Sequence, residues 1–230
     1  MIFHWRLGLS KTEGASSEVL LELIVITGIG LFLFSLTPSS LWVYEILSLI
    51  YLLVERRIRR RPLEKLGIKY HGIIGDLRKS LHIIVLVAVG IQFAVVIGSY
   101  CFWPPLLIHL QGRVTYLQTH FGSFAPSFFF LPLIGVATLL EELVFRGFVQ
   151  ERLSWFCNDS APIIMGALLM SIFHYSPGML TVVIVDLSFV LLDSSLYGLI
   201  YMRSRNVFVS WIAHLLADLV SLSLLWTLSA

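Results

Sequence analysis

The most unusual residues of the chain are two adjacent carboxylates and an arginine, Glu141, Glu142 and Arg146, within the largely apolar run 139–150. An ionisable side chain inside a membrane span faces a partner or a water-filled cavity, because a charge in the bilayer centre costs roughly 3 kcal/mol or more. Helical spacing lets Glu142 pair with Arg146, since residues four apart share one face. Glu141 is rotated away from that face and needs another partner, which makes it the candidate general base.

Three further polar residues, His174, His214 and Asp218, fall on other predicted helices. At 1.5 Å rise per residue, Glu141, His174 and His214 lie roughly 16, 20 and 12 Å from the predicted cytoplasmic ends of their helices. His214 and Asp218 are four residues apart and therefore project from one face. We expect a single cavity to hold these groups.

Such a cavity supports hydrolysis. A carboxylate can take a proton from water, an imidazole can assist, and fixed donors can stabilise the oxyanion that forms. The pattern predicts cleavage of an amide bond without a serine nucleophile. Two histidines and a carboxylate also match a zinc ligand set, so the residues alone leave zinc open, although the HExxH spacing is absent.

The elements that position these residues must be membrane helices. The 230 residues are 57% hydrophobic and 13% charged, and the mean hydropathy is +0.88. This composition excludes an ordinary soluble domain and predicts an all-α, polytopic transmembrane bundle with no nucleic-acid partner. Cys101 and Cys157 have neither metal-ligand nor disulfide-framework spacing.

The hydrophobic pattern predicts about seven spans. They cover approximately Val19–Thr37, Leu41–Val54, Leu81–Cys101, Pro126–Arg152, Ala161–Tyr175, Met179–Met202 and Val207–Leu228. The fifth helix is too short to cross the hydrocarbon core comfortably, because a span needs roughly 20 residues. The segment Phe102–Ala125, interrupted by prolines, is expected to lie in the membrane interface.

The loop Glu55–Lys79 holds most of the basic residues, so the positive-inside rule predicts that this loop and the N-terminus are cytoplasmic. We expect residues 1–18 to form a cytoplasmic N-terminal segment and residues 19–230 to form one transmembrane bundle. The catalytic core is expected at about 81–225.

As an ordered set, the EExxxR motif (Glu141, Glu142, Arg146), His174 and the HxxxD motif (His214, Asp218) resemble the CAAX protease and bacteriocin-processing family (CPBP, or Abi) of intramembrane glutamic endopeptidases. The resemblance covers about 66–220. It implies a multi-pass protein of a bacterial cell membrane, surrounded by lipids, that hydrolyses a peptide bond of a membrane-associated protein or peptide without a cofactor.

The resemblance also implies a role for each motif residue. Glu141 and His174 would activate the water, His214 and Asp218 would stabilise the oxyanion, and the second glutamate and the arginine of EExxxR would support them. The family often has Asn where Asp218 stands. An ionised Asp cannot donate a hydrogen bond, so Asp218 is either protonated or orients His214.

Two alternatives remain at this point. The first is a non-catalytic membrane scaffold or bacteriocin-immunity protein of the same family. The second is a transporter that uses buried acids as a proton relay, in which Asp186 and Asp193, seven residues apart on one face, would take part. Polar contacts between helices are the simpler explanation of these two aspartates.

Overall fold

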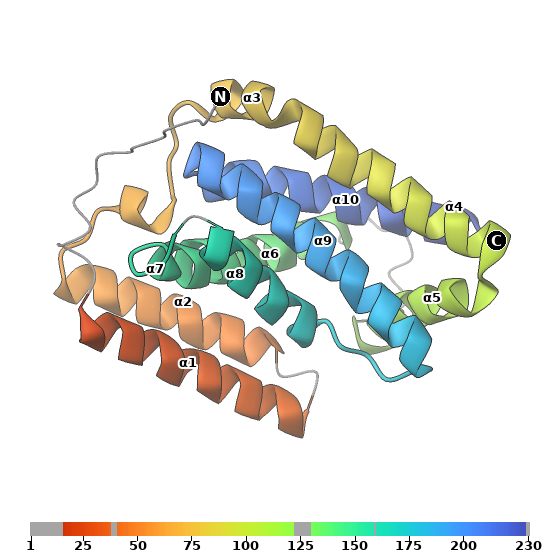
Figure 1. Ribbon diagram of the computed structural model, residues 1–230, viewed down its shortest axis with the longest axis horizontal. Coiled ribbons are helices and arrows are strands. Elements are labelled where there is room, and N and C mark those ends of the chain that lie inside the picture. Colours follow the sequence, from red (N-terminus) through yellow and green to blue (C-terminus); the bar gives the residue numbers. More distant parts are fainter. Residues whose placement is uncertain (1–15, 38–40, 122–129, 159, 229–230) are drawn as a thin grey trace.

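The computed structural model describes residues 16–37, 41–121, 130–158 and 160–228, and this part of the chain is helical and contains no strand (Figure 1). In chain order the helices are α1 (Ser17–Leu36), α2 (Leu41–Ile58), the 3-10 turn η2 (Leu63–Leu66), α3 (Ile73–Val85), the π-helix η3 (Leu86–Ile91), α4 (Gln92–Phe102), α5 (Pro104–Phe121), α6 (Phe130–Glu142), the π-helix η4 (Leu143–Gln150), α7 (Glu151–Leu153), α8 (Ser160–Phe173), α9 (Leu180–Ser204) and α10 (Val207–Thr227).

Local sequence signals explain several helix boundaries. The side chain of Ser16 accepts a hydrogen bond from the Val19 amide at 3.4 Å and caps α1, while Asn206 caps α10 through a 3.0 Å bond from the Phe208 amide. Pro104 lies in the first turn of α5, where the missing amide proton is no loss. These caps fix where each helix enters the bundle.

The helices form a bundle with two outer pieces and a central group (Figure 1). On one side, α1 and α2 form a hairpin; on the other, α3, η3 and α4 form one continuous long helix. Between them lie α8, α9, α10 and the α6–η4 helix. Aromatic packing joins the hairpin to the centre, because Tyr44 of α2 stacks on Phe173 of α8 with ring centroids 4.8 Å apart.

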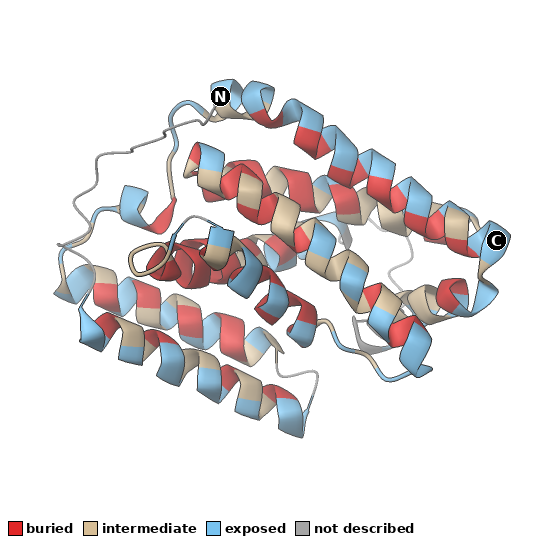
Figure 2. Ribbon diagram, in the orientation of Figure 1, coloured by how far each residue is buried: buried red, intermediate tan, exposed pale blue. Residues whose placement is uncertain are grey.

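Burial is concentrated on one element. Every residue of η4 from Val144 to Gln150 is buried (Figure 2), whereas large apolar side chains such as Phe32 of α1 and Leu180 at the start of α9 are exposed. Apolar side chains on the outside and charged ones in the centre reverse the soluble pattern and suit a lipid environment. The π-helix that carries the EExxxR arginine is therefore the core of the bundle.

Among the described residues, four helices are long and apolar enough to cross a membrane: Ser17–Leu36, Ile73–Phe102, Leu180–Ser204 and Val207–Thr227. The chain is an integral membrane protein with the predicted helical-bundle fold. The predicted short fifth helix is α8, which has 14 residues. The helix containing η4 and the helix α2 carry several charges, which is why they do not meet the same criterion.

One predicted helix start is wrong. The helix expected to begin near Leu81 begins at Ile73, within the basic loop, and continues through η3 and α4 to Phe102. The segment expected in the membrane interface contains the regular helix α5, since its prolines occupy the first turn, and its place in the interface stays a prediction. Most of the predicted N-terminal segment 1–18 lies outside the described residues.

Candidate active site

The first motif lies where an α-helix becomes a π-helix. Glu141 and Glu142 form the last turn of α6, and Arg146 follows in η4. A π-helix has one more residue per hydrogen-bonded turn than an α-helix, and such segments frequently occur at functional sites. Glu142 and Arg146 are fully buried, and Arg146 Nε lies 3.2 Å from Glu142 Oε2. The ion pair predicted from their spacing is confirmed.

Arg146 also attaches η4 to α9. Its Nη2 donates a 3.0 Å hydrogen bond to Ser194 Oγ, and its guanidinium lies 5.9 Å from the ring centroid of Tyr197. A buried guanidinium needs such partners because desolvating a charge is costly. Arg146 therefore fixes Glu142 in position rather than facing a substrate.

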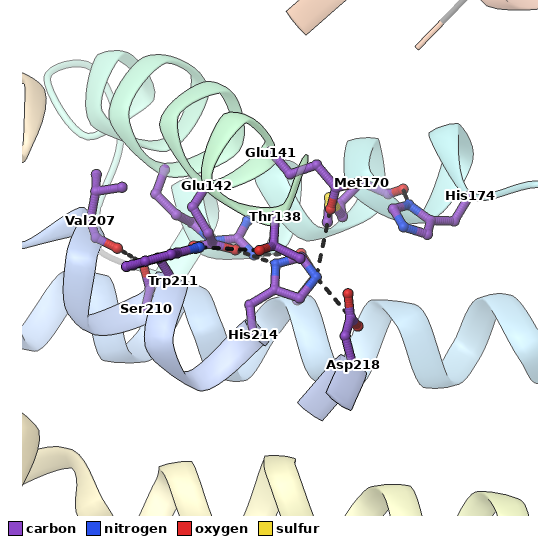
Figure 3. Close-up of polar contacts among 12 residues, drawn as sticks. Thr138, Glu141, Glu142, Met170, His174, Val207, Ser210, Trp211, His214 and Asp218 are labelled. Carbon is purple, nitrogen blue, oxygen red and sulfur yellow. Dashed lines mark hydrogen bonds and ion pairs between the residues drawn. The ribbon is translucent and has the colours of Figure 1, made fainter. Parts of the chain in front are cut away.

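His214 of α10 is the centre of the site (Figure 3). Its Nδ1 lies 3.0 Å from Glu142 Oε1, and its ring stacks on Tyr197 with centroids 4.6 Å apart. An ionised carboxylate only accepts hydrogen bonds, so Nδ1 is the donor. The other nitrogen, Nε2, lies 3.6 Å from Glu141 Oε2. The partner that Glu141 needed is therefore His214.

Asp218 completes this group from one turn further along α10. Its Oδ1 lies 3.8 Å from His214 Nε2, and 42% of its side chain is exposed. The distances from Nε2 to Asp218 and to Glu141 exceed hydrogen-bonding length. Glu142, on the opposite nitrogen, is the residue that orients the ring. Asp218 therefore does not need to orient His214, which was one of its two predicted roles.

His174 follows the last residue of α8 and lies apart from this group (Figure 3). Its Nδ1 is 2.9 Å from the carbonyl oxygen of Met170, which only accepts, so Nδ1 donates. Among the described residues, no hydrogen bond or ion pair joins His174 to Glu141. The two residues implied to activate water together are thus not in direct contact, although both lie near His214 and Asp218.

A cavity of about 150 Å³ lies between His174 and the group around His214. His214 and Asp218 of α10 line it together with His174 of α8, and α4, α5 and α9 supply the remaining walls. Glu141, with 15% of its side chain exposed, is not one of the lining residues and adjoins them through His214. The predicted clustering in one cavity therefore holds for the two histidines and Asp218, with Glu141 adjacent.

Sequence reasoning missed Arg113 of α5. Its Nη2 donates to the carbonyl oxygen of His174 at 2.6 Å and to Asp186 Oδ2 at 2.5 Å, and it lines the same cavity. Because α8 ends part-way through the bundle, the His174 carbonyl has no helical partner and Arg113 supplies one. The available signal was that Arg113 is the only lysine or arginine between residues 80 and 145.

Beside Arg113 lies a group that has the composition of a serine-protease triad, Ser176, His109 and Asp186. Ser176 Oγ is 3.0 Å and Asp186 Oδ2 is 3.3 Å from the same ring nitrogen, His109 Nε2. In a triad the serine and the aspartate contact opposite ring nitrogens. The geometry therefore does not support a serine nucleophile here.

The second aspartate of α9 joins two helices. Asp193 Oδ2 accepts a 2.8 Å hydrogen bond from Gln92 Nε2 of α4, and its Oδ1 is buried without a hydrogen bond. Asp186 is held by Arg113. The contacts of Asp186 and Asp193 agree with the simpler explanation of polar contacts between helices.

A zinc ion needs three or four ligands about 2.0–2.3 Å from one point. Among the described His, Cys, Asp and Glu residues, no group of three or more converges in a way that could hold a metal ion. His214 Nδ1 and His174 Nδ1 are both engaged by protein oxygens. The arrangement of the described side chains does not fit a zinc ligand set.

Residues 123–220 match the family model of type II CAAX prenyl endopeptidase Rce1-like proteins. This match includes every residue of the EExxxR motif, His174 and the HxxxD motif, and supports the predicted family. Neither a curated protein nor a solved structure gives a significant match to the chain.

Proposed function

We propose that this membrane protein, whose residues 123–220 match the Rce1-like CAAX protease family model, is a glutamate-type endopeptidase whose base is Glu141. The single observation that carries the proposal is the contact group around His214. The bundle holds Glu141, Glu142 and Asp218 around one imidazole, that of His214, which lines a cavity.

In the proposed reaction, Glu141 takes a proton from a water molecule as the water oxygen attacks the scissile carbonyl carbon. The carbonyl oxygen becomes an oxyanion. In its doubly protonated form, His214 donates from Nδ1 to Glu142 and from Nε2 to this oxyanion. The C–N bond then breaks as the proton held by Glu141 passes to the leaving nitrogen, which gives a carboxylic acid and an amine and restores the Glu141 carboxylate. The acid then passes its remaining proton to the amine, so the final products are a carboxylate and an ammonium ion.

The remaining residues have supporting roles in this proposal. Arg146 holds Glu142, and Glu142 holds the ring of His214, so the arginine acts on the chemistry through two contacts. Asp218, when protonated, supplies a second donor to the oxyanion. His174 faces the same cavity from α8 and would accept the second hydrogen of the water.

The test is cleavage of a quenched fluorescent peptide library by the detergent-purified protein. We expect turnover by the wild type, loss of turnover in Glu141→Gln and in His174→Ala, and no effect of a zinc chelator. Activity that disappears with the chelator and returns with zinc would contradict the glutamate mechanism.

The rival is a non-catalytic scaffold of the same family. If the wild type cleaves no peptide in the library while the Glu141→Gln variant keeps its cellular phenotype, the scaffold explanation is correct. A matched substitution of an exposed acid, Glu18→Gln in the first turn of α1, controls for the loss of one carboxylate.

A further inference from the structure

Helix α2 changes from apolar to basic at its end, where a group of arginines gathers. These residues, here called the arginine cluster, are Arg56, Arg57, Arg59, Arg60, Arg61 and, from α7, Arg152. Helix α2 ends at Ile58, and Arg60 has φ +51°, the left-handed conformation that non-glycine residues adopt rarely. The Arg61 amide donates to the Arg56 carbonyl at 3.0 Å and closes the turn. The arginines of this segment therefore surround the end of α2 and do not extend along a loop.

Two carboxylates hold the inner side of the cluster. Glu55 of α2 lies 2.9 Å from both Arg59 and Arg61 and also contacts Arg152. Glu22 of α1 lies 2.8 Å from Arg59. Three guanidiniums thus share two carboxylates. Because these contacts join α1, α2 and α7, they fix the arginine cluster to the bundle.

The indole of Trp155 keeps two of the arginines close together. The guanidinium carbons of Arg61 and Arg152 lie 4.5 and 4.4 Å from its ring centroid. Arg152 is fully buried, and neither its Nε nor its Nη1 has a hydrogen-bond acceptor among the described residues; the same holds for Arg56 Nε. Buried donors in folded proteins are normally satisfied. The cluster therefore has more positive charge and more donors than its described neighbours match.

The outer side of the cluster is not neutralised. Arg57 and Arg60 are exposed, and neither forms an ion pair with another described residue. The adjoining turns of α1 and α2 carry three carboxylates, those of Glu18, Glu22 and Glu55, against the six arginines. A positive excess remains at the surface. Guanidinium groups bind phosphate through paired N–H donors, so this excess favours a phosphate ligand.

An apolar stripe of α2 leads to these exposed arginines. Ile50, Leu53 and Val54 are each about half exposed, and at spacings of three and four residues they share one face with Arg57. The helix rises roughly 10 Å from Ile50 to Arg57. In a membrane such a face contacts acyl chains, and the headgroups lie just beyond them. A phospholipid matches both the stripe and the arginines, whereas a soluble phosphate ion matches only the arginines.

We propose that the arginine cluster binds the phosphate of an anionic phospholipid whose acyl chains lie along the apolar stripe of α2. Arg57 and Arg60 contact the phosphate, and the partly compensated arginines behind them add to the attraction. This site is separate from the cavity beside His214 and does not depend on the proposed function. Because Glu55 and Arg152 join α2 to α7, the bound lipid stabilises the packing of the α1–α2 hairpin on the central helices.

Native mass spectrometry of the detergent-purified protein tests the site, because it counts the lipids bound to the folded chain. The probes are dioleoyl phosphatidylglycerol, which is anionic, and dioleoyl phosphatidylcholine, which has the same acyl chains and no net charge. The wild type should prefer phosphatidylglycerol, and the double variant Arg57→Gln/Arg60→Gln should bind it about 10- to 30-fold more weakly. The matched control Arg78→Gln/Lys79→Gln removes the same charge from exposed positions of α3 and should keep the wild-type affinity. Equal affinity of the wild type for the two lipids, or an equal loss in both double variants, overturns the proposal.

The thermal unfolding midpoint distinguishes a lipid headgroup from a free phosphate. Phosphatidylglycerol should raise the midpoint of the wild type and leave that of Arg57→Gln/Arg60→Gln unchanged, while inorganic phosphate at the same concentration should change neither. An equal rise with inorganic phosphate would assign the cluster to a soluble anion and overturn the lipid assignment. Neither measurement uses peptide turnover, so the result stands whether or not the protein is a protease.

Discussion

Two groups of buried charged side chains in this protein contain carboxylates and arginines, but they differ in how the carboxylates are paired. At the ends of α2 and α7, one carboxylate, Glu55, contacts Arg152. It also contacts Arg59 and Arg61, both at 2.9 Å. At the site, three carboxyl groups surround His214, and within the described part of the chain Arg146 is the one guanidinium that contacts them, through Glu142.

The balance of partners separates a structural group from a reactive one. Glu55 has guanidinium partners on both oxygens, so it joins α2 to α7 and has no oxygen left for chemistry. Among the described residues, Glu141 has one ion-pair contact, to His214 at 3.6 Å, which is beyond hydrogen-bonding length, and His214 lines a cavity. Under-compensated ionisable groups next to a cavity are candidates for catalysis, whereas saturated ones hold helices together.

Glu141→Gln should have the largest effect on activity. The amide keeps the shape but cannot take a proton, so peptide turnover should fall by about 10³-fold. The thermal unfolding midpoint in detergent should stay within roughly 2 °C, because the residue has one long contact. If the variant unfolds instead, Glu141 stabilises the fold and is not the catalytic base.

Glu142→Gln should have the second-largest effect on activity, because Glu142 contacts both Arg146 and the ring of His214. We expect turnover to fall between about 10- and 100-fold as the imidazole loses its orientation. Stability should also fall, by about 3 kcal/mol, since Arg146 keeps a buried charge with one partner fewer. Turnover and thermal unfolding measured on one preparation separate the two effects. If neither turnover nor stability falls in this variant, Glu142 is not part of the site.

Arg113→Ala should lower turnover by about tenfold through kcat rather than KM, because the His174 carbonyl loses its donor and a small displacement of a catalytic group is costly. Arg113→Lys should recover part of this loss. Arg78→Ala, at an exposed position of α3, is the matched control. An equal effect of both alanine substitutions would indicate a general charge effect.

Glu55→Gln should have the smallest effect on activity. Breaking a buried pair destabilises a fold by about 3 kcal/mol or more, so the unfolding midpoint should fall clearly. Turnover per folded molecule, measured below that midpoint, should remain within about twofold of the wild type. Exposed Glu64→Gln in η2 is the control. A large loss of turnover in the folded variant would break the distinction between the two groups.

The parts of the structure that the sequence predicted are those set by spacing along one helix. Residues four apart share a face, so Glu142 and Arg146 could be paired in advance. Pro177 and Gly178 predicted the early end of α8. The π-helical winding of η4 was not predictable, because it shifts the backbone hydrogen bonds by one residue and the side-chain types in the sequence do not specify that shift.

Contacts between helices were also beyond the sequence. His214 was expected beside Asp218 on its own helix, but its closest carboxylate is Glu142 of α6. Which faces meet depends on how each helix is rotated against its neighbours, and that follows from side-chain packing over the whole bundle. The contacts of Arg113 with the end of α8 and with α9 could not be predicted for the same reason.

A packed layer between His214 and the arginines at the ends of α2, α7 and α9 bears on the membrane as a permeability barrier. The proposed hydrolysis needs water part-way across the bilayer, and a continuous water column would let protons and ions run down their gradients. Arg146 and Tyr201 are fully buried beyond the site, so water that enters the cavity meets a layer of packed side chains. A protease built in this way would cleave peptide bonds inside an energised membrane without discharging it.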